Sequence, residues 1–231
     1  MTVDVHALVF DTYGTLVDWR SSVLDELTVL GAGIDRERFL TEWKACYRAG
    51  MDKVESGEWP WTTIDEIYRR RLVELLPAYG VTLEAAAIDD LAHVWWRLRP
   101  WPDTVAGLSR LRRRFVIAPL SNASFAGMVH LARFAGLPWD GVITAENARA
   151  YKPNPKVYRT AVTLLGLAPE QILMVAAHNY DLRAARAEGL RTAFIPRPTE
   201  YGLGQTTDLA PDDAWDVVAK DVEHLAAVLE A

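Results

Sequence analysis

The chain has 231 residues, half of them hydrophobic, and is therefore long enough to bury a large core. Its 25 Lys and Arg residues against 31 Asp and Glu residues give a net charge of −6, which argues against a general binder of nucleic acids or anionic membranes. The basic run RLRRRF at 110–115 is the main exception, and a helix end facing water accounts for it without a ligand.

The cysteine count and the first residues predict a cytoplasmic protein. Cys46 is the single cysteine and cannot form an intrachain disulfide, and MTVDVHALVF lacks the basic start and long apolar middle of a secretory signal. No run reaches the roughly 18 apolar residues of a membrane span. Cys46 sits in a helical pattern without a nearby histidine, so we interpret it as a structural thiol rather than a nucleophile.

Short apolar runs alternate with helical patterns along the chain, which is typical of an α/β fold with a doubly wound, Rossmann-like parallel sheet. The first run is ALVF at 7–10, and about a hundred residues without a good strand pattern follow it. That is too long for an ordinary connection. We therefore expect a helical cap of residues 17–100 inserted after the first strand, with 1–16 and 101–231 forming the core. Amphipathic helical stretches in the cap lie near 20–30, 36–54, 62–76 and 84–97.

The remaining core elements follow the cap. Apolar runs predict strands at 115–120, 141–145, 172–177 and 192–196. Helical patterns predict helices at 124–135, 155–166 and 181–188. Gly166 and Gly189 end the last two helices, where glycine suits a left-handed C-cap.

Polar side chains follow four of the predicted strands. Because ligands bind beyond the carboxyl ends of the strands in an open parallel sheet, these side chains are expected to meet at one rim and form an active site. Four independent polar loops are the alternative. The residues are Asp11 after the first strand, Ser121 and Asn122 after the second, Lys152 after the third, and His178, Asn179 and Asp181 after the fourth.

This order of residues resembles the haloacid dehalogenase superfamily over almost the whole chain, in the segments FDTYGT, PLSNAS, YKPNP and AAHNYDL. Within it the chain is similar to the type II 2-haloacid dehalogenases, in VFDTYGTLVDW, RLRPWPD and AAHNYDL. The resemblance implies hydrolysis of haloacetates and (S)-2-haloacids to 2-hydroxy acids through an ester on Asp11, with inversion at carbon 2. It also implies that no metal or other cofactor is needed, and that the protein is a homodimer.

The residue two positions after Asp11 separates this activity from that of the superfamily's phosphatases. A phosphatase needs a second acid there to protonate a leaving alkoxide, and Tyr13 cannot do so near neutral pH. Ala177 replaces a carboxylate of the phosphatase motif GDxxxD, which weakens any magnesium site. A halide leaves without a proton, so both positions favour dehalogenation.

The resemblance also assigns catalytic roles. Lys152 neutralises and orients Asp11, although a lysine before PNP is otherwise an exposed one. Asp181, aided by His178, holds and activates the hydrolytic water. A helix N-cap for Asp181 and a core histidine for His178 are the structural alternatives.

Further residues are expected to bind the substrate. Ser121 and Thr15 would hold its carboxylate or the ester carbonyl, Asn122 would solvate the departing halide, and Tyr13 and Asn179 would line the same site. Tyr158 matches a tyrosine of the family, although a tyrosine on a helix face is usually part of a core.

The cap differs from the family pattern at one positively charged residue. Many type II enzymes carry an arginine after the tryptophan of EWKACYR, where this chain has Lys44, and the two side chains are not equivalent. Arg48, one turn further on, is expected to compensate. The nine tryptophans are expected to pack the cap on the core and to close a small dry pocket.

Two other functions compete with this one. The first is a phosphatase with an unusual second motif position. The second is a non-catalytic relative that binds a small acid or a protein partner through the cap. Retention of Asp11, Lys152 and Asp181 together argues against the second, because a binding module does not need a nucleophile.

Overall fold

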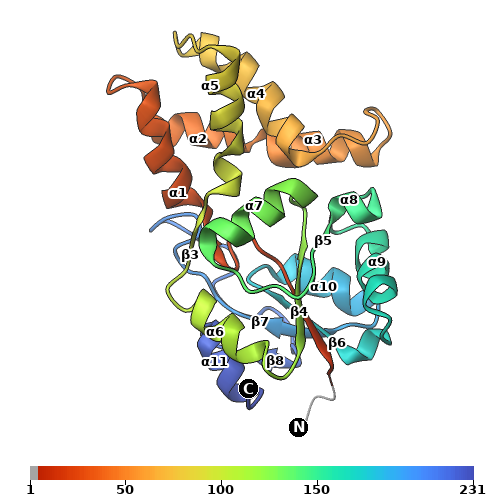
Figure 1. The fold of residues 1–231 in the computed structure, drawn as a ribbon. Coiled ribbons are helices and arrows are strands. Elements are labelled where there is room, and N and C mark those ends of the chain that lie inside the picture. The colour runs from red at the N-terminus through yellow and green to blue at the C-terminus, as the bar shows by residue number, and fades with distance from the viewer. Residues whose placement is uncertain (1–4) are drawn as a thin grey trace.

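The computed structural model describes residues 5–231 and has a six-stranded parallel sheet at its centre (Figure 1). The strands lie in the order β5-β4-β1-β6-β7-β8, and every neighbouring pair is parallel. This confirms the predicted α/β class. The strands are β1 Ala7–Phe10, β4 Val116–Ser121, β5 Ile143–Thr144, β6 Ile172–Ala176, β7 Arg191–Phe194 and β8 Val217–Val218.

A helical segment is inserted between β1 and β4 and lies over one end of the sheet (Figure 1). It is joined to the core by an antiparallel ribbon in which β2, Val17–Asp18, pairs with β3, Arg99–Pro100. The insertion is confirmed, whereas domain boundaries at 16/17 and 100/101 stay a prediction, and residues 1–4 lie outside the described residues. The insertion contains α1 Trp19–Glu26, α2 Arg36–Lys44, α3 Cys46–Glu55, α4 Ile64–Ala78 and α5 Ala85–Ala92, with 3₁₀ turns at Leu27–Leu30 and His93–Trp96.

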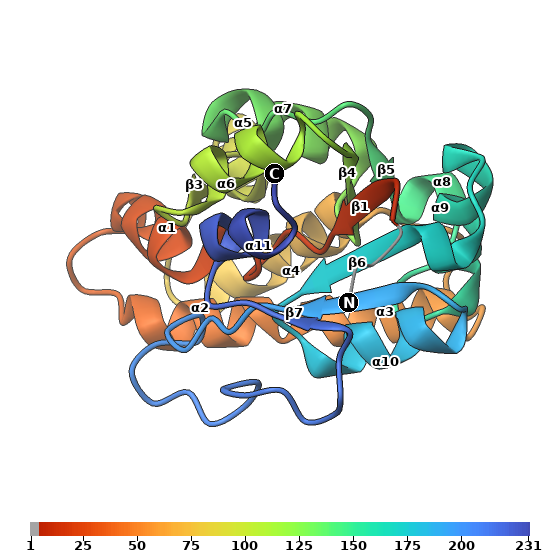
Figure 2. The same cartoon turned by 90° about the horizontal axis from the view of Figure 1, so that it is seen from below.

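The core helices cover both faces of the sheet because successive strand residues point to opposite sides. In β1, Val9 packs in a cluster with residues of α9 and α10, whereas Leu8 and Phe10 pack with residues of α6, α7 and α11. Figure 2 shows these two groups of helices on opposite sides of the strands. The core helices are α6 Thr104–Leu111, α7 Phe125–Ala135, α8 Ala145–Ala148, α9 Pro155–Leu165, α10 Asn179–Ala187 and α11 Val222–Val228, with a 3₁₀ turn at Pro169–Gln171.

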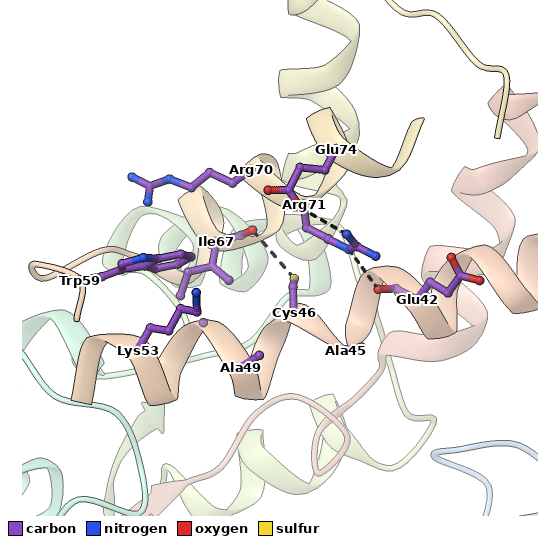
Figure 3. A pocket seen from close by; sticks show the side chains of 11 residues that line it. Glu42, Ala45, Cys46, Ala49, Lys53, Trp59, Ile67, Arg70, Arg71 and Glu74 are labelled. Atoms are coloured by element: carbon purple, nitrogen blue, oxygen red, sulfur yellow. Dashed lines mark hydrogen bonds and ion pairs between the residues drawn. The ribbon is translucent and has the colours of Figure 1, made fainter. Parts of the chain in front are cut away.

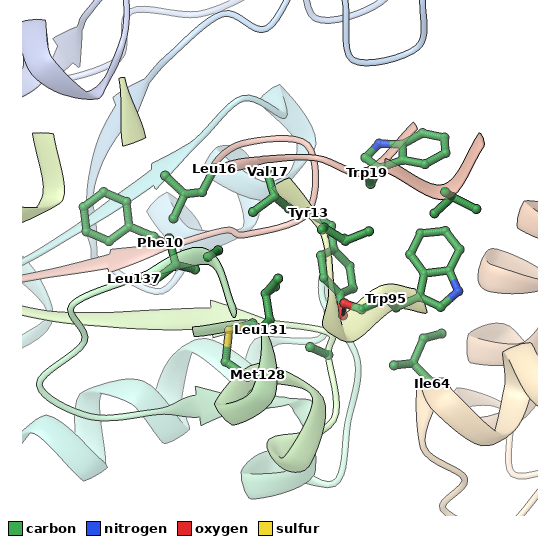
Figure 4. Close-up of a cluster of buried hydrophobic side chains, with 14 of the residues drawn as sticks. Phe10, Tyr13, Leu16, Val17, Trp19, Ile64, Trp95, Met128, Leu131 and Leu137 are labelled. Atoms are coloured by element: carbon green, nitrogen blue, oxygen red, sulfur yellow. Dashed lines mark hydrogen bonds between the residues drawn. The ribbon is translucent and has the colours of Figure 1, made fainter. Parts of the chain in front are cut away.

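The insertion packs on the core through a continuous cluster of aromatic and aliphatic side chains (Figure 4). Trp95 of the insertion is fully buried, and its ring stacks on Tyr68 with 4.2 Å between centroids. The rings of Tyr13 and Trp19 each lie 6.1 Å from it. Each buried aromatic ring removes a large apolar area from water, so this cluster fixes the insertion over the sheet. The predicted packing role is confirmed for the tryptophans of this cluster, whereas Trp215 packs in the second cluster of the core with residues of α9 and α10.

The helices differ from the sequence prediction in a few places. Helices α6 and α11 and the two-residue strand β8 are not among the predicted elements, although both helices bury residues at helical spacing, such as Leu108 and Leu111 in α6. The predicted helix at 36–54 is two helices, interrupted at Ala45. Gly166 has φ of 65° and ends α9 as the predicted left-handed cap. Within residues 5–231, no helix is both long and apolar enough to cross a bilayer.

Candidate active site

A small pocket lies beyond the carboxyl ends of β1, β4 and β6. After β1 the chain places β4 and β5 on one side of it and β6, β7 and β8 on the other, so the strand order reverses at this point. The pocket encloses about 50 Å³. It is lined by six predicted residues, Asp11, Tyr13, Lys44, Ser121, Asn122 and His178, and by five others, Trp19, Tyr47, Tyr180, Glu200 and Tyr201.

Asp11 is held in one orientation by three side chains. Its Oδ1 accepts a hydrogen bond from Lys152 Nζ at 2.8 Å, and its Oδ2 accepts from Thr15 Oγ1 at 2.7 Å and lies 3.0 Å from His178 Nδ1. Burial disfavours the charged carboxylate, but Lys152 and His178 outweigh burial and hold the pKa of Asp11 below its usual value. Asp11 is therefore buried, ionised and oriented, as a carboxylate nucleophile must be.

Lys152 connects Asp11 to a second buried carboxylate. It is 2% exposed, so the alternative of an exposed surface lysine is wrong. Its Nζ also donates to Asp181 Oδ2 at 2.5 Å. Burial by itself would lower the pKa of Lys152, but Asp11 and Asp181 outweigh burial and raise this pKa, which keeps the side chain cationic.

Asp181 lies behind Lys152 and does not line the pocket. Its Oδ2 binds Lys152, and its Oδ1 accepts from the Tyr158 hydroxyl at 2.6 Å. Each oxygen therefore has a protein partner, and the role of Asp181 in holding the hydrolytic water stays a prediction. Asp181 lies in the first turn of α10, whose N-cap residue is His178, so the N-cap alternative is wrong.

His178 lies between two carboxylates. Its Nδ1 is 3.0 Å from Asp11 Oδ2, and its Nε2 is 3.2 Å and 3.0 Å from the two oxygens of Glu200. Burial disfavours the imidazolium, but Glu200 and Asp11 outweigh burial and raise the pKa of His178 well above its usual value. In the free enzyme the ring is therefore a cation that donates to both carboxylates.

Ser121 and Asn122 come to the pocket from the end of β4, as predicted. The Asn122 Oδ1 accepts from the backbone N of Lys152 at 2.7 Å, and its Nδ2 donates to the Tyr47 hydroxyl at 3.1 Å. Asn122 thus ties the loop after β4 to the loop before α9. The Ser121 Oγ accepts from the backbone N of Ala123 at 3.2 Å, which leaves its hydroxyl as a donor towards the pocket.

Lys44 reaches the pocket from the end of α2 and is surrounded by aromatic rings. Its Nζ lies 3.6 Å from the ring centroid of Tyr47 and 5.2 Å and 5.4 Å from those of Trp19 and Trp95. Burial lowers the pKa of Lys44 to about 8. An ammonium held by aromatic faces keeps its charge available for an anion in the pocket.

The position two residues after Asp11 provides no acid. The Tyr13 hydroxyl donates to the Trp95 carbonyl at 3.3 Å, and burial raises the pKa of Tyr13 well above its usual value. Tyr13 therefore cannot protonate a leaving alkoxide near neutral pH.

The donor set also fits a divalent cation poorly. The Lys152 ammonium binds both Asp11 and Asp181, and alanine occupies position 177 after β6. Across residues 5–231, no group of three His, Cys, Asp or Glu side chains is placed to hold a metal ion. The site therefore suits a substrate whose leaving group departs as a stable anion better than the magnesium-assisted hydrolysis of a phosphate ester.

Thr15 and Tyr158 are near the site but act behind it. The Thr15 Oγ1 donates to Asp11 and accepts from the backbone N of Ala177 at 2.9 Å. It therefore orients the nucleophile, whereas the sequence predicted a contact with the substrate. Tyr158 is fully buried and donates to Asp181.

Two predicted residues lie away from the pocket. The Arg48 side chain is 63% exposed and pairs with Asp52 at 3.0 Å. It does not compensate for Lys44, because its side chain extends to solvent and does not reach the pocket that Lys44 lines. The Asn179 side chain binds Asp208 and other residues of the segment before β8, so it fixes that segment instead of the substrate.

Glu200 is the main site residue that the sequence does not predict. It is 2% exposed and follows β7 in the segment RPTEYG. The strand-end rule that pointed to four loops also points to this fifth one. Glu200 lies several residues beyond the strand in an irregular segment, and no local pattern distinguishes it from a surface carboxylate.

Cys46 lies in a different cavity, of about 320 Å³, between α3 and α4 (Figure 3). Its Sγ is 3.9 Å from the carbonyl oxygen of Ile67. Burial raises the pKa of Cys46 to about 12, so the thiol stays protonated and unreactive. This agrees with its interpretation as a structural thiol.

Comparisons with known proteins give the same assignment. Residues 5–189 match the model of the haloacid dehalogenase-like hydrolases. The chain is 30% identical to the (S)-2-haloacid dehalogenase of Xanthobacter autotrophicus, over 87% of this chain and 79% of that protein. It is similar to the solved structure of the L-2-haloacid dehalogenase PA0810, with 43% identity and a TM-score of 0.95, over 98% of this chain and 99% of that one. It is also similar to the solved structure of the defluorinating L-2-haloacid dehalogenase Rha0230, with 40% identity and a TM-score of 0.94, over 98% of this chain and 96% of that one. The chain therefore belongs to the haloacid dehalogenase-like hydrolase family and, within it, to the L-2-haloacid dehalogenases.

Proposed function

We propose that the protein hydrolyses haloacetates and other short L-2-haloacids, which are (S)-2-haloalkanoic acids, to 2-hydroxy acids. The observation that carries this proposal is the state of Asp11, which is buried, ionised and directed into a small pocket. Such a carboxylate can attack carbon, and a halide leaves without a proton donor. The names of the similar proteins support the same activity.

In the first step, a carboxylate oxygen of Asp11 attacks carbon 2 and the halide leaves with the electrons of the carbon–halogen bond. The leaving group lies opposite the nucleophile, on the side of the insertion. There Lys44 supplies positive charge, and Asn122, whose Nδ2 donates to the Tyr47 hydroxyl at 3.1 Å, would exchange this contact for the halide. Ser121 remains on the side of the core to hold the substrate carboxylate. The attack inverts carbon 2 and leaves an ester on Asp11.

In the second step, water attacks the acyl carbon of that ester, so the configuration at carbon 2 does not change again. His178 is suited to activate the water, because its Nδ1 already lies 3.0 Å from Asp11 Oδ2. We therefore assign general-base catalysis to His178, with Asp181 orienting Lys152.

The size of the pocket favours compact substrates. A volume of about 50 Å³ leaves little room for a carbon chain beyond the reacting centre and its carboxylate. Trp19, Tyr180 and Tyr201 are among its walls, and extra methylenes would collide with them. The defluorinating relative Rha0230 supports including fluoroacetate among the candidate substrates.

Halide release from a panel of acids tests this function. Chloro-, bromo- and fluoroacetate and the two enantiomers of 2-chloropropionate would be assayed without added metal, together with (S)-2-chlorobutyrate. We expect turnover of the (S) enantiomer over the (R), and a kcat/KM about tenfold or more lower for the butyrate. In oxygen-18 water, a single turnover should place the label in Asp11. Label appearing first in the product hydroxyl, or no halide from any acid, would contradict the proposal.

The pKa of Lys44 predicts how substrate binding depends on pH. Because this pKa lies at about 8, Lys44 is charged below pH 8 and neutral above it. If only the charged form binds substrate, KM should rise about tenfold between pH 7 and pH 9. Lys44→Arg is the matched control, since a guanidinium keeps its charge throughout this range. An equal alkaline rise of KM in both proteins would mean that Lys44 is not the titrating group.

We also propose that the protein works as a homodimer in the cytoplasm. The dimer is supported by the resemblance to type II dehalogenases. The compartment is supported by Cys46, which is the single cysteine of the chain and cannot form an intrachain disulfide.

A further inference from the structure

Glu200 occupies a place that the nucleophile loop leaves open for it. The Trp19 Nε1 donates to Glu200 Oε1 at 3.0 Å, and His178 Nε2 faces both carboxylate oxygens. Gly14 has φ of +86°, and a Cβ built on it would lie 2.1 Å from Glu200 Oε1. Only glycine suits position 14, both for its backbone conformation and for the carboxylate packed against it.

The loop that carries Glu200 is fixed to the same nucleophile loop. The Arg197 Nε donates to the Thr15 carbonyl at 2.8 Å, and its guanidinium binds Asp103 with two hydrogen bonds of 2.8 Å and 2.7 Å. Asp103 also accepts from the backbone N of Val222 at 2.8 Å. The position of Glu200 relative to Asp11 is therefore set by rigid contacts on both sides.

We propose that Glu200 is a positioning residue for ester hydrolysis: it fixes His178 with Nε2–H towards its own carboxylate and Nδ1 towards Asp11. This proposal rests on the proposed dehalogenase function and adds a coupling to it. Formation of the ester removes the negative charge of Asp11, which is one of the two partners of the imidazolium. Ester formation thereby releases His178 from its ion pair with Asp11 and turns it into the base that the next step needs.

The protons balance over the cycle. In the free enzyme His178 is protonated on both nitrogens, between Asp11 and Glu200. Once Asp11 is an ester, the Nδ1 proton passes to solvent. The Nε2 proton stays on the ring and keeps its hydrogen bond to Glu200. Water then attacks the ester carbonyl and gives one proton to Nδ1, and the tetrahedral intermediate expels the product alkoxide, which takes the remaining proton of the attacking water. The enzyme returns with Asp11 ionised and His178 protonated. The net release is one proton and one halide per turnover, as hydrolysis of a carbon–halogen bond requires.

The charges around His178 support this coupling. The two groups in contact with its nitrogens are Asp11 and Glu200. The ring of Tyr180 lies 5.8 Å from the imidazole, and burial raises the pKa of Tyr180 well above its usual value, so this side chain stays neutral. Two cations lie nearby: Lys152 binds the other oxygen of Asp11, and Lys44 lines the same pocket. With Asp11 neutralised, Glu200 is the anion that still contacts the ring and keeps its orientation.

Glu200→Gln tests the proposal, because it keeps the shape of the side chain and removes its charge. With chloroacetate we expect one halide per active site in a rapid burst, then steady-state turnover slowed about 10²-fold or more. Mass spectrometry of the quenched protein should find the glycolyl ester on Asp11. Asp103→Asn is the control, since it weakens the support of the same loop without touching His178. It should lower the melting temperature and give no burst.

Other outcomes would overturn the proposal or the function separately. Equal slowing of ester formation and of turnover in Glu200→Gln, without accumulated ester, would overturn the role of Glu200 alone. Absence of halide release by the wild type would overturn the proposed function. If Glu200→Gln does not fold, Glu200→Asp keeps the charge but shortens the reach and should give a smaller burst. His178→Asn should reproduce the burst, and adding Glu200→Gln to it should slow turnover no further, because the two residues act as a unit. A double variant whose turnover falls by the product of the two single-variant factors would contradict this.

Discussion

Asp11→Asn is expected to abolish catalysis, with kcat/KM for chloroacetate reduced by about 10⁴-fold or more. The amide has the shape of the carboxylate but carries no negative charge, so it cannot displace the halide. The fold should persist, because Lys152 keeps its contact with Asp181 at 2.5 Å. Halide release measured by ion chromatography, with circular dichroism as a check of folding, would give the result.

The matched control is Asp52→Asn. Asp52 undergoes the same chemical change, but its side chain is 58% exposed and pairs with Arg48 on the surface of the insertion. Halide release should be unchanged in this variant. Substantial turnover by Asp11→Asn would show that another group attacks the substrate, and the roles assigned to the pocket would have to be redrawn.

Lys152→Met is expected to have the largest effect on stability. It leaves Asp11 and Asp181 buried without the cation that binds both of them. Removing one member of a buried ion pair typically costs about 3–5 kcal/mol of the free energy of unfolding. Activity should be lost as well, because without Lys152 the pKa of Asp11 rises and the nucleophile becomes protonated. Urea denaturation at pH 7 would measure the change in stability.

The loss of stability should depend on pH in a defined window. In the wild type the pKa of Asp11 is lower in the folded state than in the unfolded state. Its contribution to the free energy of unfolding is therefore present above the unfolded pKa near 4 and is lost as the pH falls. The pKa of Lys152 is raised in the folded state, so its contribution to the free energy of unfolding is fully present below the ordinary lysine pKa of 10.5 and is lost as the pH rises through the raised pKa. The difference between wild type and variant should therefore be greatest between about pH 5 and pH 10 and shrink in acid. Lys53→Met, at a half-buried lysine paired with Glu58, is the control and should cost under about 0.5 kcal/mol. A loss below about 1 kcal/mol for Lys152→Met at pH 7 would contradict this account of the buried network.

Much of the core could be predicted because its strands are buried on both faces. The run ALVF at 7–10 is β1 residue for residue, and the run at 172–177 differs from β6 by one residue. A continuous apolar run of four to six residues is typical of a parallel strand that helices cover on both sides. In contrast, β8 has two residues, and its pairing with β7 depends on tertiary contacts that no local pattern records.

The site could be predicted where a residue directly follows a strand. Asp11, Ser121 and His178 meet in the pocket for that reason. Glu200 could not be found in this way, because its position is set by a long irregular loop. Arg48 was misplaced because spacing from Lys44 indicates a neighbouring position on the helix but not where a long side chain ends, and Arg48 extends to solvent and pairs with Asp52.

The ribbon of β2 and β3 brings the two ends of the insertion side by side, one strand spacing apart. The insertion contributes Lys44 and Tyr47 to the pocket, whereas the core contributes Asp11 and its supporting residues. The nucleophile and the residues that orient it are therefore encoded apart from the cation that faces the halide. A different helical segment whose ends meet in the same way could be exchanged at this junction, and the walls and charge opposite Asp11 would change while the nucleophile and its supports stayed in place.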